Sequence, residues 1–244
     1  MVDLSEPFEP VAETDGINTF NEKSLHAALK RWYAQPADRF EARVDGFIID
    51  LVRGDQLIEI QTGSFSPLKR KLHALAQQHP VRLVYPVALE KWIVRLPQDS
   101  GSAARPTRRK SPLRGRVELL FKELVYIPAL ICSDNFSLEV LLIREEEVRR
   151  FDSARARSRR RKGWVTHERR LLEVVDRKVF QTPADLACLL PEALADPFTV
   201  RQAAALSRQP DWLVRKMLYC LRAMGMVEVF GKRGRSTIYA RLPR

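Results

Sequence analysis

The sequence has few cysteines and histidines, and their positions argue against two kinds of scaffold. Its three cysteines, Cys132, Cys188 and Cys220, lie far apart and form no CxxC pair. A disulfide framework is therefore not expected, and buried, inert thiols are. The four histidines do not have the spacing of zinc ligands, which argues against a structural zinc site.

Long apolar runs are also missing. No stretch approaches the roughly 20 apolar residues that a membrane-spanning helix needs. The first residues, Met1 to Glu6, are acidic and lack the basic and then apolar order of a signal peptide. The sequence therefore predicts a cytoplasmic protein without a membrane partner.

Negative charge is scarce relative to positive charge. The chain has 42 Lys and Arg against 30 Asp and Glu, a formal net charge of +12. Among their charged groups residues 1–22 have only acids, whereas basic residues crowd into 105–116, 149–162 and the C-terminal region. Clustered positive charge is typical of proteins that bind a polyanion, so DNA is the expected partner. A charge that served solubility alone would mix both signs over the surface.

The pattern of the first 150 residues predicts an α/β domain. A flexible acidic lead-in covers residues 1–18 and the domain covers 19–150, with a basic linker or loop at 98–115. The expected elements, in order, are a helix over 22–34, a hairpin of strands over 44–52 and 57–61, a helix over 66–79, strands over 81–86 and 91–96, a helix over 116–126, a strand over 136–143 and a short helix that begins at Glu145. A second basic linker is expected at 151–165.

The last part of the chain, residues 166–244, has the element order of a winged helix-turn-helix. Helices are expected over 184–190, 199–208 and 211–224, followed by strands over 226–230 and 237–242 around a basic turn. The residues expected to contact DNA are Trp212, Arg215, Lys216, Tyr219 and Arg222 on the third helix and Lys232, Arg233 and Arg235 in the turn. Winged helices also serve as protein–protein modules, so this alternative stays open.

The hairpin of the first domain carries acids in apolar strands. Asp50 lies in one strand and Glu59 in the next, where a carboxylate is costly unless it is paired or binds a metal. The two-residue period places Glu59 and Gln61 on one face. Two carboxylates and the Ile60 carbonyl would suit Mg²⁺ or Mn²⁺. In the plainer alternative, Glu59 and Gln61 form a hydrogen-bonded pair at a sheet edge.

The stretch 44–63 resembles the PD-(D/E)XK nuclease superfamily, which has a restriction-endonuclease-like α/β/α fold. The core of that family is helix, hairpin, helix and strand, with an acid on one strand and (D/E)xK on the next. The RecB-type and Holliday-junction-resolvase branches are the most similar. The resemblance implies that Asp50 and Glu59 are metal ligands and that Glu22, on the first helix, is an additional acid. The family's lysine position is Gln61 here, and Lys69 or Lys71 could supply the charge instead, with Lys69 preferred.

Together these features predict a metal-dependent DNA endonuclease whose catalytic residues are Asp50, Glu59, Gln61 and Lys69. The domain order is similar to that of the transposon-end endonuclease that accompanies some heteromeric transposases. Cutting both strands of a duplex would call for a homodimer. The alternative is an inactive nuclease fold that binds DNA as a regulator or as a subunit of a defence, repair or transposition assembly. An RNA-directed role has only the positive charge in its favour.

Overall fold

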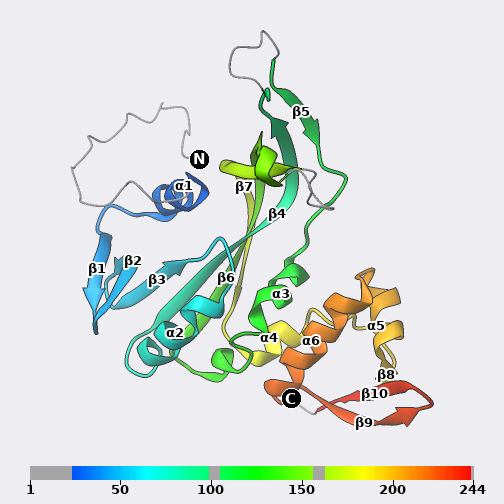
Figure 1. Ribbon diagram of the computed structural model, residues 1–244. Coiled ribbons are helices and arrows are strands. Elements are labelled where there is room, and N and C mark those ends of the chain that lie inside the picture. The colour runs from blue at the N-terminus through cyan, green and yellow to red at the C-terminus, as the bar shows by residue number, and fades with distance from the viewer. Residues whose placement is uncertain (1–23, 99–104, 156–162, 243–244) are drawn as a thin grey trace, which may run out of the picture.

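The computed structural model describes residues 24–98, 105–155 and 163–242 and shows a mixed α/β protein (Figure 1). Within these ranges the main sheet has seven strands in the order β1-β2-β3-β4-β6-β7, with β5 paired to β4. The acidic lead-in 1–18 and Glu22 lie outside the described residues. No helix in the described ranges is long and apolar enough to cross a membrane.

The first part of the sheet follows the expected order, with one strand added. Helix α1 (Ser24–Tyr33) precedes β1 (Arg39–Val44), β2 (Phe47–Arg53) and β3 (Gln56–Ile60), which form an antiparallel meander. The sequence pattern predicts one strand over 44–52, whereas the structure has a turn at Asp45 and Gly46 that separates β1 from β2. Both of these residues have positive φ, 48° and 79°, and the chain reverses there.

The segment after the hairpin returns to the sheet through a short helix. The 3₁₀ turn η2 (Ser66–Leu68) leads into α2 (Lys69–Leu75), and β4 (Val81–Arg95) then runs parallel to β3. The helix was expected here, but it ends at Leu75 rather than near residue 79. Strand β4 is continuous where two short strands were expected, with a register shift between Ala88 and Glu90.

The other half of the sheet is longer than the sequence analysis predicted. Strand β6 (Phe136–Phe151) runs parallel to β4, and β7 (Trp164–Phe180) pairs antiparallel with β6. The short helix expected from Glu145 is therefore wrong: the acids of that segment are paired with basic residues across the sheet, so the ladder continues. Strand β5 (Thr107–Lys110) lies within the predicted linker 98–115 and pairs with β4. The sheet extends to Phe180, beyond the expected domain limits at 150 and 166.

Three short turns of helix connect β5 to β6. They are η3 (Val117–Leu120), α3 (Phe121–Leu124) and η4 (Leu130–Cys132). The first two replace the single longer helix predicted over 116–126. Cys132 and Cys188 are exposed and only Cys220 is buried, which corrects the prediction of three buried thiols. A further 3₁₀ turn, η5 (Ser153–Arg155), follows β6.

The C-terminal module contains the expected helices and hairpin. It comprises α4 (Pro183–Ala187), β8 (Phe198–Thr199), α5 (Val200–Ser207), α6 (Asp211–Ala223), β9 (Val227–Arg233) and β10 (Ser236–Arg241). Within the described residues its strands form a second sheet in the order β8-β10-β9. Capping boxes at Thr182 and Thr199 fix where α4 and α5 begin, because they satisfy free backbone amides of the first turn.

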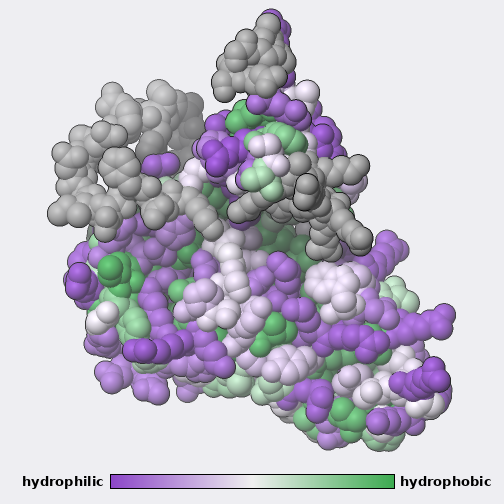
Figure 2. Space-filling model, viewed as in Figure 1, coloured by the Kyte–Doolittle hydropathy of each residue, from purple (hydrophilic) through white to green (hydrophobic). Residues whose placement is uncertain are grey.

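Apolar cores lie on both faces of the main sheet. On one face Leu25 and Leu29 of α1 pack against the sheet. On the other face a single continuous core joins sheet residues such as Leu138 to Phe121 of α3 and Leu213 of α6. The C-terminal module therefore packs directly against the sheet layer (Figure 1). Hydrophilic residues cover much of the visible surface, including the C-terminal module (Figure 2).

Candidate functional site

Asp50 and Glu59 come together at the point where the β2–β3 hairpin opens. The paired residues of these strands end at Leu51 and Ile58. Beyond these residues the Asp50 carboxylate takes the place of a backbone carbonyl in the ladder. Its Oδ2 atom accepts a hydrogen bond from the Ile60 backbone amide at 2.8 Å. Both carboxylates are largely buried. The two carboxylates thus occupy neighbouring positions on β2 and β3, at the end of the paired segment.

Helix α1 supplies a partner for Asp50. The Nε2 atom of His26 lies 3.2 Å from Asp50 Oδ2. Burial raises the pKa of Asp50, but the hydrogen bonds from His26 and the Ile60 amide and the nearby charge of Lys30 outweigh it, and the net pKa is lowered. Asp50 is therefore ionised at neutral pH.

Helix α2 supplies the partner for Glu59. The Nζ atom of Lys71 lies 2.6 Å from Glu59 Oε2. Burial and the negative charge of Asp50 nevertheless raise the pKa of Glu59 to about 7, although Lys71 opposes both effects. Two neighbouring carboxylates with separated pKa values are a common feature of sites that bind cations or move protons.

Lys71, and not Lys69, reaches the carboxylates. Its ammonium also donates to the Ile48 carbonyl at 2.5 Å, which holds it over the hairpin. Lys69 is exposed at the start of α2. Helix α2 begins at Lys69, after the 3₁₀ turn. Lys71 lies next to the buried Leu72 in the first turn of this helix, and its side chain points toward the sheet.

Gln61 does not contact the carboxylates. Its side-chain amide donates to the Ser64 carbonyl at 2.7 Å, and its backbone amide donates to the Val84 carbonyl at 2.9 Å. The alternative of a Glu59–Gln61 hydrogen bond is therefore not what the structure shows, since Glu59 pairs with Lys71. The sequence names Lys71 as the alternative to Lys69, and the structure favours Lys71. His26 is the site residue that the sequence did not indicate, and only the helical spacing that brings it to the sheet could have done so.

Asp50 and Glu59 supply carboxylate oxygens, the donor type that hard divalent cations prefer. Among the described residues no group of three or more His, Cys, Asp or Glu side chains gathers in a metal-binding arrangement. A cation here would therefore have Asp50 and Glu59 as its side-chain ligands. Mg²⁺ is commonly held by one or two carboxylates, with water and substrate phosphate completing its coordination. A divalent ion would also relieve the repulsion that raises the pKa of Glu59.

The helix α6 exposes most of the side chains that were expected to contact DNA. Trp212 and Tyr219 are 48% and 54% exposed, and Arg215 and Arg222 are exposed beside them. Lys216 differs, because its Nζ donates to the Lys122 carbonyl of α3 at 3.2 Å and so faces the sheet layer.

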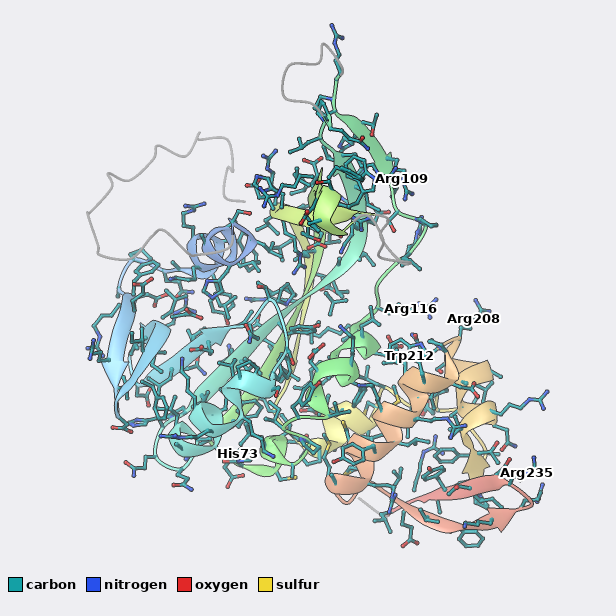
Figure 3. All side chains as sticks on the ribbon, in the orientation of Figure 1. His73, Arg109, Arg116, Arg208, Trp212 and Arg235 are labelled. Atoms are coloured by element: carbon teal, nitrogen blue, oxygen red, sulfur yellow. The ribbon has the colours of Figure 1, made fainter. Side chains whose placement is uncertain are left out.

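The β9–β10 hairpin presents its basic residues to solvent. Lys232, Arg233 and Arg235 are exposed, and Gly234 has a φ of 58° at the turn. Arg235 lies at the far end of this hairpin in Figure 3.

Comparison with known proteins identifies relatives but no solved structure. A model of the family described as "Domain of unknown function (DUF8091)" matches residues 23–181, which is the sheet layer through the end of β7. A Treponema pallidum (strain Nichols) protein with the name "Uncharacterized protein" is 32% identical over 228 residues, covering 93% of this chain and 88% of the relative. No solved structure matches the chain significantly. The protein therefore belongs to the DUF8091 family.

Proposed function

We propose that this protein is a metal-dependent DNA endonuclease. The observation that carries the proposal is the arrangement of Asp50, Glu59 and Lys71: two adjacent carboxylates and an ammonium group converge where a hairpin opens. Hydrolysis of a phosphodiester requires positive charge near the phosphate and activation of a water molecule. This combination of groups can serve both needs.

The order of elements supports a PD-(D/E)XK fold for the sheet layer. Helix α1, the meander β1–β3, helix α2 and strand β4 follow the helix, hairpin, helix and strand of that core. Asp50 lies on β2 and the Glu59-Ile-Gln61 motif lies at the end of β3, as the family pattern requires. In the C-terminal module, helix, strand, two helices and a hairpin support a winged helix.

The residues would have distinct roles. Asp50 and Glu59 would hold Mg²⁺ or Mn²⁺, which when bound lowers the pKa of water and stabilises charge on a phosphate. Lys71 would supply the positive charge that the family draws from a lysine at position 61. Gln61 would orient the attacking water once its amide leaves the Ser64 carbonyl.

The C-terminal module would position the DNA. The exposed face of α6 would contact the grooves, and the basic β9–β10 hairpin would contact phosphates. Two copies of the chain would be needed to cut both strands of a duplex, so a homodimer on DNA is part of this proposal.

The test is a cleavage assay on linear duplex, supercoiled plasmid, single-stranded and branched DNA. Each substrate is incubated with Mg²⁺, Mn²⁺ or a chelator, using wild type, Asp50→Ala and Asp55→Asn. Asp55 is an exposed carboxylate in the turn of the same hairpin, so it controls for a simple loss of charge. Metal-dependent cutting by wild type and Asp55→Asn but not by Asp50→Ala is expected. Equal cutting by Asp50→Ala would overturn the assignment.

A second candidate function is DNA binding without cleavage. The observation in its favour is that Glu59 already has a cationic partner in Lys71, while the Gln61 amide is held by its own loop. Such a protein would act as a regulator or as a subunit of a defence, repair or transposition assembly. Salt-sensitive DNA binding by wild type and Asp50→Ala, with no cutting under any condition, would favour this candidate.

A further inference from the structure

We propose that a single strand of DNA binds in the cavity between the main sheet and the start of α6. This inference rests on the proposed function and specifies its substrate as DNA with a single-stranded segment. The cavity has a volume of about 1140 Å³. Its walls come from β4, β6 and β7, the segment 109–116, α3 and the loop before α6, so that both parts of the chain contribute.

The lining carries an excess of positive charge. Among the described residues, seven basic side chains and three acidic ones line the cavity, a formal excess of four. The basic residues are Lys91, Arg109, Arg114, Arg116, Lys122, Arg149 and Arg169, and the acids are Glu123, Glu145 and Glu147. Phosphate neutralisation supplies most of the affinity of a protein for a polynucleotide, so this excess fits a phosphate backbone.

The acids on the sheet are neutralised locally. Glu145, which is fully buried, lies 2.7 Å from Lys91 Nζ and 2.6 Å from Arg169 Nη2. Glu147 pairs with Arg149 at 2.8 Å and accepts a hydrogen bond from Thr166. Burial raises the pKa of Glu147, but these two partners and the charge of Lys91 outweigh it, and the pKa falls to about 2. The floor of the cavity is thus a closed network of ion pairs, and the remaining positive charge lies on the rim.

Two arginines on the rim are available to a ligand. Within the described residues Arg109 of β5 and Arg116 before η3 have no acidic partner within ion-pair distance. Arg116 Nη1 is 3.4 Å from the Ser207 carbonyl, which places its guanidinium beside the α5–α6 turn. In Figure 3 Arg109, Arg116 and Trp212 lie along the same side of the molecule, between β5 and the start of α6.

The wall formed by the α5–α6 turn can recognise a base. Trp212 lines the cavity and is 48% exposed, so its indole has an open face for stacking. Gln209 also lines the cavity, and its Nε2 atom is buried without a hydrogen-bond partner in the described structure. A buried donor without a partner is costly, and a base or phosphate oxygen would satisfy it.

The size and position of the cavity favour a single strand that leads to the loop after Gln61. At about 1140 Å³ the cavity slightly exceeds the roughly 300–1,000 Å³ of pockets for small ligands, so it has room for a few nucleotides rather than for a turn of duplex. Its lining includes Thr62, Gly63 and Ser64, which directly follow Gln61. Arg169 donates to the Thr62 carbonyl at 3.1 Å and joins this loop to the floor. A strand stacked on Trp212 would therefore reach the loop that directly follows the Glu59-Ile-Gln61 motif.

The test measures binding in a chelator, where no metal-dependent cutting interferes. The full chain is titrated against fluorescein-labelled oligo-dT of about ten nucleotides, the length that a stacking groove typically covers. The variants are Trp212→Leu, Trp212→Phe and Arg116→Gln. The matched controls are Trp32→Leu, because Trp32 of α1 is 46% exposed outside the cavity, and Arg43→Gln, because Arg43 is exposed on β1.

Trp212→Leu is expected to weaken oligo-dT binding about tenfold, because it keeps apolar volume but loses the stacking surface. Trp212→Phe should retain most of the affinity, which separates stacking from a folding defect. Arg116→Gln should reduce the slope of log K against log salt by about 0.7, as expected for one phosphate contact to a single strand. Neither control should change binding. Unchanged affinity in Trp212→Leu, or tighter binding of oligo-rU than of oligo-dT, would overturn the proposal.

The binding and cleavage results are separable. If Asp50→Ala cuts DNA like wild type while Trp212→Leu loses oligo-dT binding, the endonuclease assignment falls and the single-strand site remains. If Asp50→Ala loses cutting while Trp212→Leu binds oligo-dT normally, the endonuclease remains and the single-strand site falls.

Discussion

The ammonium group of Lys71 lies 2.6 Å from the Glu59 carboxylate and reaches it from helix α2, not from the strand that carries the acid. In the pattern of PD-(D/E)XK nucleases, the lysine lies two residues after the acid on the same strand, where this chain has Gln61. The structure thus brings a positive charge to the same carboxylate from another direction. Whether this charge acts in catalysis decides between the two proposed functions.

Replacing Lys71 by methionine is expected to reduce the rate of DNA cleavage by at least about 10²-fold, the typical loss when a group that stabilises the transition state is removed. Without its partner, Glu59 should take up a proton, because burial and Asp50 already raise its pKa to about 7. DNA binding in a chelator should not change. Single-turnover cleavage measures the rate, a DNA titration in chelator measures binding, and a thermal melt of the same samples shows that the variant is folded.

Lys69→Gln is the matched control for that variant, since Lys69 begins the same helix but is exposed. Its cleavage rate should equal that of wild type. A loss of rate in Lys69→Gln together with normal cleavage by Lys71→Met would restore the assignment that the sequence alone suggested.

A lysine at position 61 should partly replace Lys71. In a Lys71→Met background, Gln61→Lys is expected to restore cleavage by about tenfold or more, because it returns a cation to the face that carries Glu59. Gln61→Leu in the same background removes the amide contact to Ser64 without adding charge. Equal rates for the two double variants would show that the charge at this position is irrelevant.

The sequence predicted the local parts of this site well. Arg53-Gly54-Asp55 indicated the hairpin turn, and Gly54 has a φ of 59° there. The cost of burying acids in apolar strands indicated that Asp50 and Glu59 need partners, and both have them. Each of these predictions depends only on residues close together along the chain.

Features that depend on distant pairing could not be predicted in the same way. The segment Glu145–Val148 has helical propensity, yet it remains a strand because Lys91 and Arg169 neutralise Glu145 across the sheet. The basic run at 155–162 of the sequence led to the expectation of a linker at 151–165, and the charged residues of β7 obscured the alternation of that strand. The choice of Lys71 over Lys69 depends on the residue at which α2 begins, and helix boundaries are uncertain from sequence alone.

Glu59 should make the stability of the protein depend on pH. Its pKa is raised from 4.5 to about 7 in the folded state, so the folded protein binds more protons than the unfolded chain between these values. The free energy of unfolding therefore falls as the pH rises from 5 to 8. Glu59→Gln removes this loss. The free energy of unfolding of the variant minus that of wild type should therefore rise by about 1–3 kcal/mol between pH 5 and pH 8. Urea unfolding at both pH values measures it, and a constant difference between the two proteins would contradict the raised pKa.

Divalent cations should stabilise the folded protein through the same carboxylates. At a metal concentration of about 100 times Kd, the gain is roughly 2.7 kcal/mol, seen as a higher Tm in Mg²⁺ or Mn²⁺ than in chelator. Protons compete for Glu59, so the gain should shrink as the pH falls below about 7. Asp50→Asn should abolish the gain and Asp55→Asn should keep it. An equal rise in Tm for Asp50→Asn would place the cation elsewhere.

The continuous core predicts that the sheet and the C-terminal module unfold together. Leu120 of η3 is fully buried in the core that also contains Leu213 and Met217 of α6. Leu120→Ala should therefore lower the free energy of unfolding by about 2–5 kcal/mol and shift one single calorimetric transition. Leu206→Ala, at a half-exposed leucine of α5, should change it by less than about 0.5 kcal/mol. The contrary result is two separate transitions, of which only one shifts in Leu120→Ala. It would mean that the C-terminal module folds independently, as expected for two domains joined by a linker.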